Sequence, residues 1–279
     1  MQSLAIHKKS NKLKVRCSQV KVEDNTISDD EACELVNGTE LTIGDEADEG
    51  IRAYFFTAVK NNNATGILLL SDIFGFEDSS TRDFAYRLAC NGYNVLVPDL
   101  FNGDPWTKDR PKASFEQWIT KHKPESKAKT IFESAKWMIN EFAALEISKK
   151  LGIIGFCYGG GRVIEILAQD KDAYFGSGVS FYGTRIDSSV VAHNNIKVPL
   201  LMITGDNDAL CPVKNLEDIK RSSNNNELIK IGVFKERGHG FAHRPQTPEE
   251  DEDAEEAFMM MRNWLHHGLI AEKVELKSL

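Results

Sequence analysis

The stretch KLGIIGFCYGGGRVIEILAQ, residues 150–169, changes character abruptly at its centre. The apolar run KLGIIGF is typical of a buried strand, and GGRVIEILAQ is typical of a helix. Between them, residues 155–159 have the form glycine–x–nucleophile–x–glycine, with Cys157 as the nucleophile. This form describes a sharp strand-to-helix turn, in which glycines are needed because neighbouring side chains would clash. We therefore predict that the Cys157 thiol is lifted clear of a sheet.

The helix that follows Cys157 gives this turn a chemical role. A helix N-terminus stabilises a thiolate, and the backbone N–H of Tyr158 is placed to stabilise an oxyanion. The alternatives are a buried cysteine at a glycine-rich helix start and a phosphate-binding loop. The Walker lysine is absent and the glycine spacing is wrong, which excludes the phosphate loop.

Around this turn, apolar runs alternate with helical patterns along the chain. The runs that predict strands are 65–71, 93–101, 150–156, 176–183, 198–206 and 228–236. Helical spacing of apolar residues predicts helices over 79–93 and 127–142. Such alternation predicts an α/β fold, with a mostly parallel sheet covered by helices on both faces. No insertion is long enough for a large cap domain, and functional residues are expected at the carboxyl ends of the strands.

The last predicted helix begins with an acidic run. Thr247 is placed as its N-cap and Pro248 as its first residue, so the acids at 249–256 lie where the helix dipole favours them. Its predicted buried residues are Ala254, Phe258, Met261 and Leu265.

The N-terminal part of the chain differs in composition from the rest. Residues 1–22 are basic, with no acid before Glu23, which is typical of an organelle-targeting leader. The segment VRCS at 15–18 resembles the cleavage region of plastid transit peptides, so we expect a chloroplast protein of plant plastid type. The alternative is a disordered basic tail on a cytoplasmic protein. Residues 23–64 suggest a strand or hairpin region, with the asparagines 61–63 as a hairpin turn and 224–226 as a loop.

Composition excludes several classes of protein. The net charge of -8 disfavours binding to nucleic acid or to an acidic membrane surface. No apolar run is long enough to span a membrane. The five cysteines are an odd number without a CxxC motif or a Cys/His cluster, which disfavours disulfides and zinc and favours a reducing compartment. No metal or cofactor is expected.

Two further segments complete a possible catalytic triad. LLMITGDNDALCP ends a predicted strand and offers Asp206 and Asp208, and VFKERGHGFAHR ends the last strand and offers His239. The chain order nucleophile, acid, histidine is the order found in α/β-hydrolases. Asp206, Asp208 and His239 also resemble metal ligands, but a triad explains two of them better.

Five segments resemble the dienelactone hydrolase (carboxymethylenebutenolidase) family of α/β-hydrolases. They are SDIFGFED, GYNVLVPDLF, GFCYGGG, GDNDALCP and GHGFAHR, and the resemblance runs from about residue 50 to 268. It implies a hydrolase domain over 50–279, preceded by an extension at 23–49 and the basic leader at 1–22. It also implies a monomer that hydrolyses small-molecule esters or lactones through a thioester on Cys157. In this reading Asp208 is the acid, His239 the base, and Ile73 joins Tyr158 in the oxyanion hole.

The chain departs from the bacterial members of this family at two positions. Asp72 stands where they have a glutamate linked to gating of the thiol, and aspartate is one methylene shorter. Their arginines grip a substrate carboxylate, and here His243 and Arg244 lie in that region, shifted by one residue. We expect Asp72 and Arg244 to contact substrate, together with the apolar side chains of Phe74, Trp106 and Phe241.

Other functions remain open at this stage. A ligand-binding or receptor-like protein would keep the triad and turn over slowly, and a peptidase would use the same groups. A redox thiol protein would need a resolving cysteine, for which Cys211 is the nearest candidate in the acid loop. The natural substrate cannot be read from these patterns.

Overall fold

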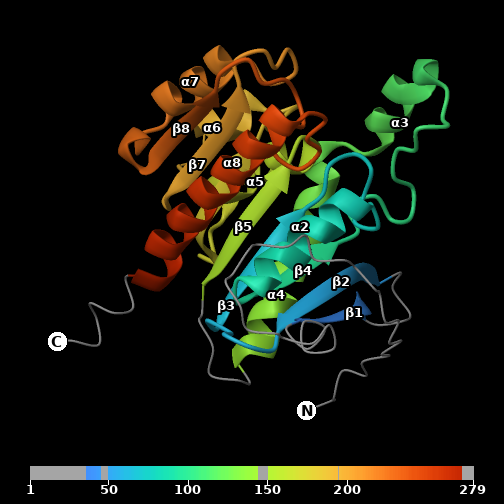
Figure 1. Ribbon diagram of the computed structural model, residues 1–279, viewed down its shortest axis with the longest axis vertical. Coiled ribbons are helices and arrows are strands. Elements are labelled where there is room, and N and C mark those ends of the chain that lie inside the picture. The colour runs from blue at the N-terminus through green and yellow to red at the C-terminus, as the bar shows by residue number, and fades with distance from the viewer. Residues whose placement is uncertain (1–35, 45–49, 144–149, 194, 272–279) are drawn as a thin grey trace.

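A computed structural model describes residues 36–44, 50–143, 150–193 and 195–271. These residues form one eight-stranded sheet in the order β1-β2-β4-β3-β5-β6-β7-β8 (Figure 1). The β1/β2 and β2/β4 pairs are antiparallel, and the strands from β4 to β8 pair in parallel, so the predicted mostly parallel sheet is confirmed. The strands are β1 (Val36–Ile43), β2 (Ile51–Ala58), β3 (Thr65–Leu70), β4 (Tyr93–Pro98), β5 (Leu151–Phe156), β6 (Phe175–Phe181), β7 (Leu200–Gly205) and β8 (Ile229–Phe234).

Helices cover both faces of this sheet. One face carries α2 (Ser79–Cys90) and α8 (Pro248–His266), which lie in front of the sheet in Figure 1. These two helices meet where the Phe84 and Phe258 rings lie 5.3 Å apart and the Arg87 guanidinium covers Phe258 at 3.7 Å. The other face carries α4 (Pro124–Ala143), α5 (Tyr158–Gln169), α6 (Ser188–His193) and α7 (Val213–Ser222). The fold is therefore that of an α/β-hydrolase.

The remaining helical pieces are short. The 3₁₀ turn η1 (Lys112–Ser114) leads into α3 (Phe115–Lys121), which projects beyond the sheet at the upper right of Figure 1. The turn η2 (Asn226–Leu228) precedes β8, where a loop was predicted, and η3 (His267–Ala271) extends α8. The predicted cap of α8 is confirmed, because the Thr247 side chain accepts a hydrogen bond from the Glu250 N–H. The four residues predicted to form its buried face are all buried: Ala254, Phe258, Met261 and Leu265.

The N-terminal region is partly as predicted. β1 and β2 form an antiparallel hairpin, and β1, from the predicted extension, joins the main sheet. The prediction of a hairpin turn at the asparagines 61–63 is wrong, because β2 pairs with β4 and the turn instead leads past β4 to β3. Asn62 fixes the segment between β2 and β3 against β4, because the side-chain amides of Asn62 and Asn94 of β4 donate hydrogen bonds to each other. The predicted basic leader, residues 1–22, lies outside the described residues. In the part of the chain that is described, no helix has the length and apolar character to cross a membrane.

The first turn of α5 lies very close to the neighbouring strands. A Cβ atom added at Gly159 would lie 2.4 Å from the Leu70 carbonyl oxygen and 2.5 Å from that of Ser71, at the end of β3. A Cβ at Gly155 would lie 2.4 Å from the Gly159 carbonyl oxygen. All of these contacts are with backbone atoms, which a side-chain rotation cannot relieve. Gly159 is therefore required by the approach of α5 to β3, and Gly155 by the closeness of the first turn of α5 to the end of β5.

We predict that Gly159→Ala lowers the free energy of unfolding by about 2 kcal/mol or more, because it overpacks a site walled by backbone. Urea denaturation followed by circular dichroism measures the change. Gly238→Ala is the matched control, because no atom outside its immediate neighbours lies within 4 Å of a Cβ at that position. Equal denaturation midpoints for the two variants would contradict the crowding argument.

Candidate active site

Cys157 occupies the turn between β5 and α5 in a backbone conformation that is unfavourable for a side chain. Its φ is 52° and its ψ is -113°. Strain of this kind persists only where the surroundings hold it. Here the Cys157 N–H donates to the Phe181 carbonyl at 3.0 Å, and the Cys157 carbonyl accepts from Thr184 at 2.9 Å and from Gly161 at 3.1 Å. The predicted sharp turn between strand and helix at Cys157 is confirmed, with the thiol partly exposed at the start of α5.

Asp208 and His239 meet at the carboxyl ends of β7 and β8. His239 Nδ1 lies 2.7 Å from Asp208 Oδ2, and the Asp208 side chain is fully buried. The other oxygen, Oδ1, accepts from the N–H groups of Leu210 at 2.8 Å and Cys211 at 3.0 Å. Both carboxylate oxygens thus have hydrogen-bond donors, which hold this side chain in one orientation. Asp206 instead accepts from the Glu236 N–H at 2.6 Å, as expected for a turn residue.

His239 is arranged to act on Cys157. Because Nδ1–H donates to the Asp208 carboxylate, the other ring nitrogen, Nε2, is available for proton transfer. Nε2 is buried, and no group among the described residues lies at the distance and angle of a hydrogen bond to it. Burial opposes a charged ring, but the hydrogen bond that His239 donates to Asp208 and the nearby Cys157 sulfur together raise the pKa of His239 to about 10. The site therefore favours an imidazolium beside the sulfur at neutral pH.

The two predicted oxyanion donors line the same cavity as the triad. Ile73 lies in the loop after β3, where the Phe74 N–H donates to Asp72 Oδ1 at 2.9 Å and the Ile73 carbonyl accepts from Trp106 at 2.8 Å. Tyr158 is the first residue of α5, and N–H groups in the first turn of a helix have no acceptor within that helix. The structure thus brings Ile73, Tyr158 and Cys157 to one cavity wall.

The cavity at the triad has a volume of about 560 Å³. Besides the triad cysteine and histidine, it is lined by the predicted residues Asp72, Phe74 and Arg244. Among the lining residues that were not predicted are Phe115, Ile119, Thr184, Arg185 and Leu210. Phe115 and Ile119 belong to α3 and face the cavity four residues apart, a helical spacing that was available in the sequence. A small ester fits such a largely apolar space.

Trp106 and Phe241 do not line this cavity, contrary to expectation. Trp106 packs behind Phe115 and Trp118, with ring centroids 5.0 and 5.5 Å away. Phe241 is 1% exposed and packs between Tyr182 and Phe234. Both aromatic side chains bury large apolar areas. They pack behind the loops that form the cavity and do not line the cavity itself.

A second buried network lies beside the triad and centres on Asp72. Its Oδ2 accepts from His243 Nε2 at 3.0 Å and from Arg244 at 3.0 Å (Nε) and 2.8 Å (Nη2). Arg244 also pairs with Asp78 at 2.6 Å. Burial opposes the charge of Asp72, but the bonds from His243 and the charge of Arg244 prevail and lower its pKa. Asp72 and Arg244, which were each predicted to contact substrate, are therefore in direct contact with each other.

In the sequence, His243 was noted only as the neighbour of Arg244. The structure defines the protonation and the tautomer of its ring. Burial lowers its pKa, so the ring is neutral. With Nε2–H donated to Asp72, Nδ1 must accept, and the Tyr182 hydroxyl lies 2.6 Å from it. Burial also raises the pKa of Tyr182 well above its usual value, so this hydroxyl keeps its proton and donates. The His243 ring stacks on Phe156 at 4.2 Å, next to the nucleophile.

Comparison with known proteins agrees with this geometry. The sequence profile of the dienelactone hydrolase family matches residues 51–269. The carboxymethylenebutenolidase homolog of Homo sapiens is 30% identical over 224 residues, which cover 78% of this chain and 88% of that protein. The hydrolase pyvD of Aspergillus violaceofuscus is 28% identical over 189 residues, covering 64% and 70%. The crystal structure of dienelactone hydrolase from Anabaena variabilis aligns with a TM-score of 0.64 at 17% identity, covering 84% of this chain and 99% of that one.

A parallel sheet with a nucleophile elbow and a cavity at its carboxyl edge defines an α/β-hydrolase. Within that class, the chain belongs to the dienelactone hydrolase family.

We predict that the His239 ring titrates near pH 10 and that Cys157→Ala lowers this pKa, because the variant lacks the sulfur that favours the imidazolium. Its pKa is raised relative to 6.5, so the stability linked to this proton is complete below pH 6.5 and is lost as the pH rises through 10. Nitrogen NMR of labelled histidine follows the titration. His243 is the internal control, since its pKa is shifted in the opposite direction. A His239 ring that titrates below 6.5 in the wild type would refute the assignment.

We also predict that Asp72→Asn lowers the free energy of unfolding by about 3 kcal/mol, because it leaves a partly buried arginine without its inner partner. Asp78→Asn serves as the matched control. Asp78 is a more exposed partner of the same Arg244, and asparagine can keep its N-cap bond to Ser80. Its loss is expected to stay below about 1 kcal/mol. Chemical denaturation at neutral pH measures both, and a larger loss for Asp78→Asn would overturn the ranking.

Proposed function

We propose that this chain hydrolyses carboxylic esters or lactones of small molecules through Cys157, His239 and Asp208, with a thioester intermediate. The observation that carries the proposal is the bond between the buried Asp208 and His239 Nδ1, which leaves Nε2 toward a strained, partly exposed Cys157. A redox role is less well supported. Burial raises the pKa of Cys211 to about 12, which makes it a poor resolving thiol.

In the acylation step, the Cys157 thiolate attacks the ester carbonyl carbon, and the carbonyl oxygen becomes an oxyanion. The N–H groups of Ile73 and Tyr158 are the proposed donors to that oxygen. Collapse of the tetrahedral intermediate breaks the bond to the alcohol oxygen, which takes the proton from His239 Nε2. The products are a free alcohol, or the ring-opened hydroxyl of a lactone, and a thioester on Cys157.

In the deacylation step, His239 has to work as a base. Acylation removes the charge from the Cys157 sulfur and with it one cause of the raised pKa of His239. The neutral imidazole then takes a proton from water, whose oxygen attacks the thioester carbonyl. Cleavage of the carbon–sulfur bond releases the acid and restores the thiolate beside the imidazolium. Asp208 keeps the ring in one tautomer throughout.

Arg244 and Asp72 are proposed to contact substrate at the far wall of the cavity. The Arg244 side chain is about one-fifth exposed and already pairs with Asp72 and Asp78. A substrate carboxylate at this wall would therefore compete with those carboxylates for the guanidinium. The Phe74 ring, 4.9 Å from Arg244, adds an apolar surface beside it.

We predict that the wild type turns over p-nitrophenyl acetate and a small enol lactone. Cys157→Ala should lower kcat by about a thousandfold or more, because it removes the nucleophile. Cys157→Ser should also lose most activity, since an alkoxide forms far less readily than a thiolate. Iodoacetamide should block the wild type. The buried Cys211→Ala is the control, expected to keep its sensitivity to iodoacetamide. Mass spectrometry of a quenched reaction should find the acyl group on Cys157.

If the thiol alkylates quickly near neutral pH but neither ester nor lactone is turned over, the proposal fails. Such a result would favour a ligand-binding role for the same cavity.

A further inference from the structure

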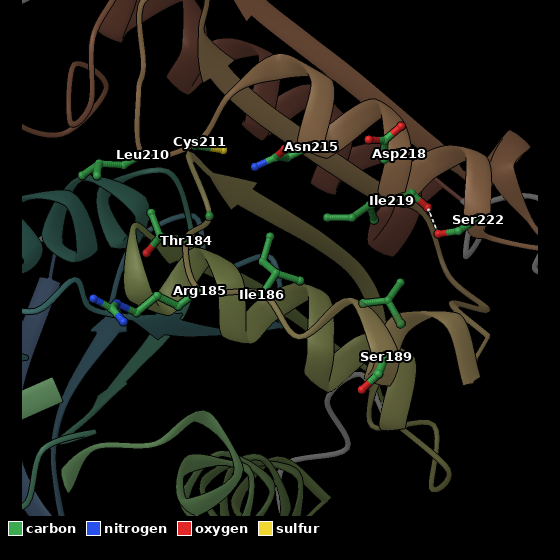
Figure 2. Close-up of a pocket in the computed structure, with 12 residues that line it drawn as sticks. Thr184, Arg185, Ile186, Ser189, Leu210, Cys211, Asn215, Asp218, Ile219 and Ser222 are labelled. Atoms are coloured by element: carbon green, nitrogen blue, oxygen red, sulfur yellow. Dashed lines mark hydrogen bonds between the residues drawn. The ribbon is translucent and has the colours of Figure 1, made fainter. Parts of the chain in front are cut away.

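A second hollow adjoins the active-site cavity. We name it the α6–α7 groove, because it lies between α6 and α7 and the loops that precede them (Figure 2). Its volume is about 730 Å³, larger than the 560 Å³ of the cavity at the triad. Ile186 and Ile219 face each other across it in Figure 2, and Val191 lines it as well. None of the residues that face this space from α6 and α7 belongs to the proposed catalytic machinery.

The groove and the active-site cavity are continuous. Thr184, Arg185 and Leu210 line both of them. Thr184 stands at the junction, with its hydroxyl oxygen 3.8 Å from the Cys157 sulfur. A molecule bound at the sulfur therefore needs to extend only past Thr184 to enter the groove.

The position of the groove indicates which part of an ester would occupy it. The proposed oxyanion donor Ile73 and the residues Phe74 and Arg244 form the wall on the β3 side. Leu210, at the mouth of the groove, lies on the opposite side in the loop that holds the acid, and its N–H donates to Asp208. In the proposed reaction, the alcohol oxygen takes a proton from His239. Because Asp208 orients His239 and also binds the Leu210 N–H, the alcohol departs on the side of Leu210. The geometry thus directs the alcohol portion toward the groove.

The groove has a mixed lining. Its apolar side chains are those of Ile186, Val191, Leu210 and Ile219, and its polar ones include Ser189, Asn215 and Ser222, with Asp218 as the one acidic side chain among its lining residues. Asn215 and Asp218 lie on α7 in Figure 2. Asp218 pairs with Arg221 at 3.1 Å, but both side chains are at least half exposed, which makes such a pair weak. Arg185, the cation at the junction, is bound to Glu116 of α3 at 3.1 Å and extends away from α7. This balance disfavours an anionic occupant.

Building on the proposed function, we propose that the α6–α7 groove is a leaving-group subsite. It selects elongated esters whose alcohol portion is apolar and carries no negative charge at its far end. The substrate class is then an ester of a small acyl group with an extended apolar alcohol or phenol.

The test uses aryl acetates with matched leaving groups. Phenyl acetate reaches only the active-site cavity, and 4-hexylphenyl acetate extends into the groove, with nearly the same phenol pKa. The wild-type kcat/KM for the hexyl ester should exceed that for phenyl acetate by about tenfold, from burial of the alkyl chain. Asn215→Trp, which fills the groove from an exposed position, should remove that gain and change phenyl acetate by less than about twofold. Glu217→Trp, an exposed position on α7 that does not line the groove, is the matched control.

Two further arms sharpen the assignment. A phenyl acetate with a carboxylate at the end of the alkyl chain should be a poorer substrate, and Asp218→Asn should improve it by about threefold. p-Nitrophenyl hexanoate carries its alkyl chain on the acyl portion, which the proposal places outside the groove. Its kcat/KM should therefore be the same in Asn215→Trp and Glu217→Trp.

The outcomes separate the two proposals. No turnover of phenyl acetate by the wild type would overturn the proposed function itself. Turnover of phenyl acetate without any gain for the hexyl ester, or a gain that survives Asn215→Trp, would overturn the subsite alone. A loss confined to p-nitrophenyl hexanoate would place the acyl chain in the groove and refute the leaving-group assignment.

Discussion

The close approach of α5 to β3 is the constraint on which the site depends. Backbone oxygens of Leu70 and Ser71 lie where a side chain at position 159 would begin, so the helix can start there only with glycine. This approach puts the N-terminus of α5 beside the loop that carries Ile73. It also forces the residue between strand and helix into a positive φ, and that residue is Cys157. One steric condition thus sets the position of the sulfur, the helix dipole and the proposed oxyanion donors.

Two buried carboxylates flank this turn and have different roles. Asp208 gives one oxygen to backbone N–H groups and the other to His239, so its charge stabilises a protonated imidazole next to the sulfur. Asp72 instead accepts hydrogen bonds from Arg244 and from a neutral His243. The two histidines lie only four positions apart, yet their pKa values are shifted in opposite directions. The difference arises because the Asp208 hydrogen bond and the Cys157 sulfur outweigh burial at His239, whereas burial prevails at His243.

The space for substrate is built from loops and short helices rather than from a cap domain. Phe115 and Ile119 of α3 cover the cavity from one side, and Arg185 joins that helix to the loop after β6 through Glu116. Trp106 and Phe241 support these loops from within the core. The polar groups of the proposed triad thus adjoin a largely apolar space, which weakens competition from water for their hydrogen bonds.

The sequence by itself determined the alternation of strands and helices, the elbow at Cys157 and the order of the triad. Each is a local pattern, because periodicity, glycine spacing and strand ends are properties of neighbouring residues. Only the tertiary structure decided that the asparagine turn passes β4, that Trp106 and Phe241 are packing residues, and that His243 is neutral. It also decided that Thr184, Arg185 and Leu210 connect the active-site cavity to a second hollow. These features depend on which loops meet at the carboxyl edge of the sheet, and residues far apart in the chain set their surroundings and charges.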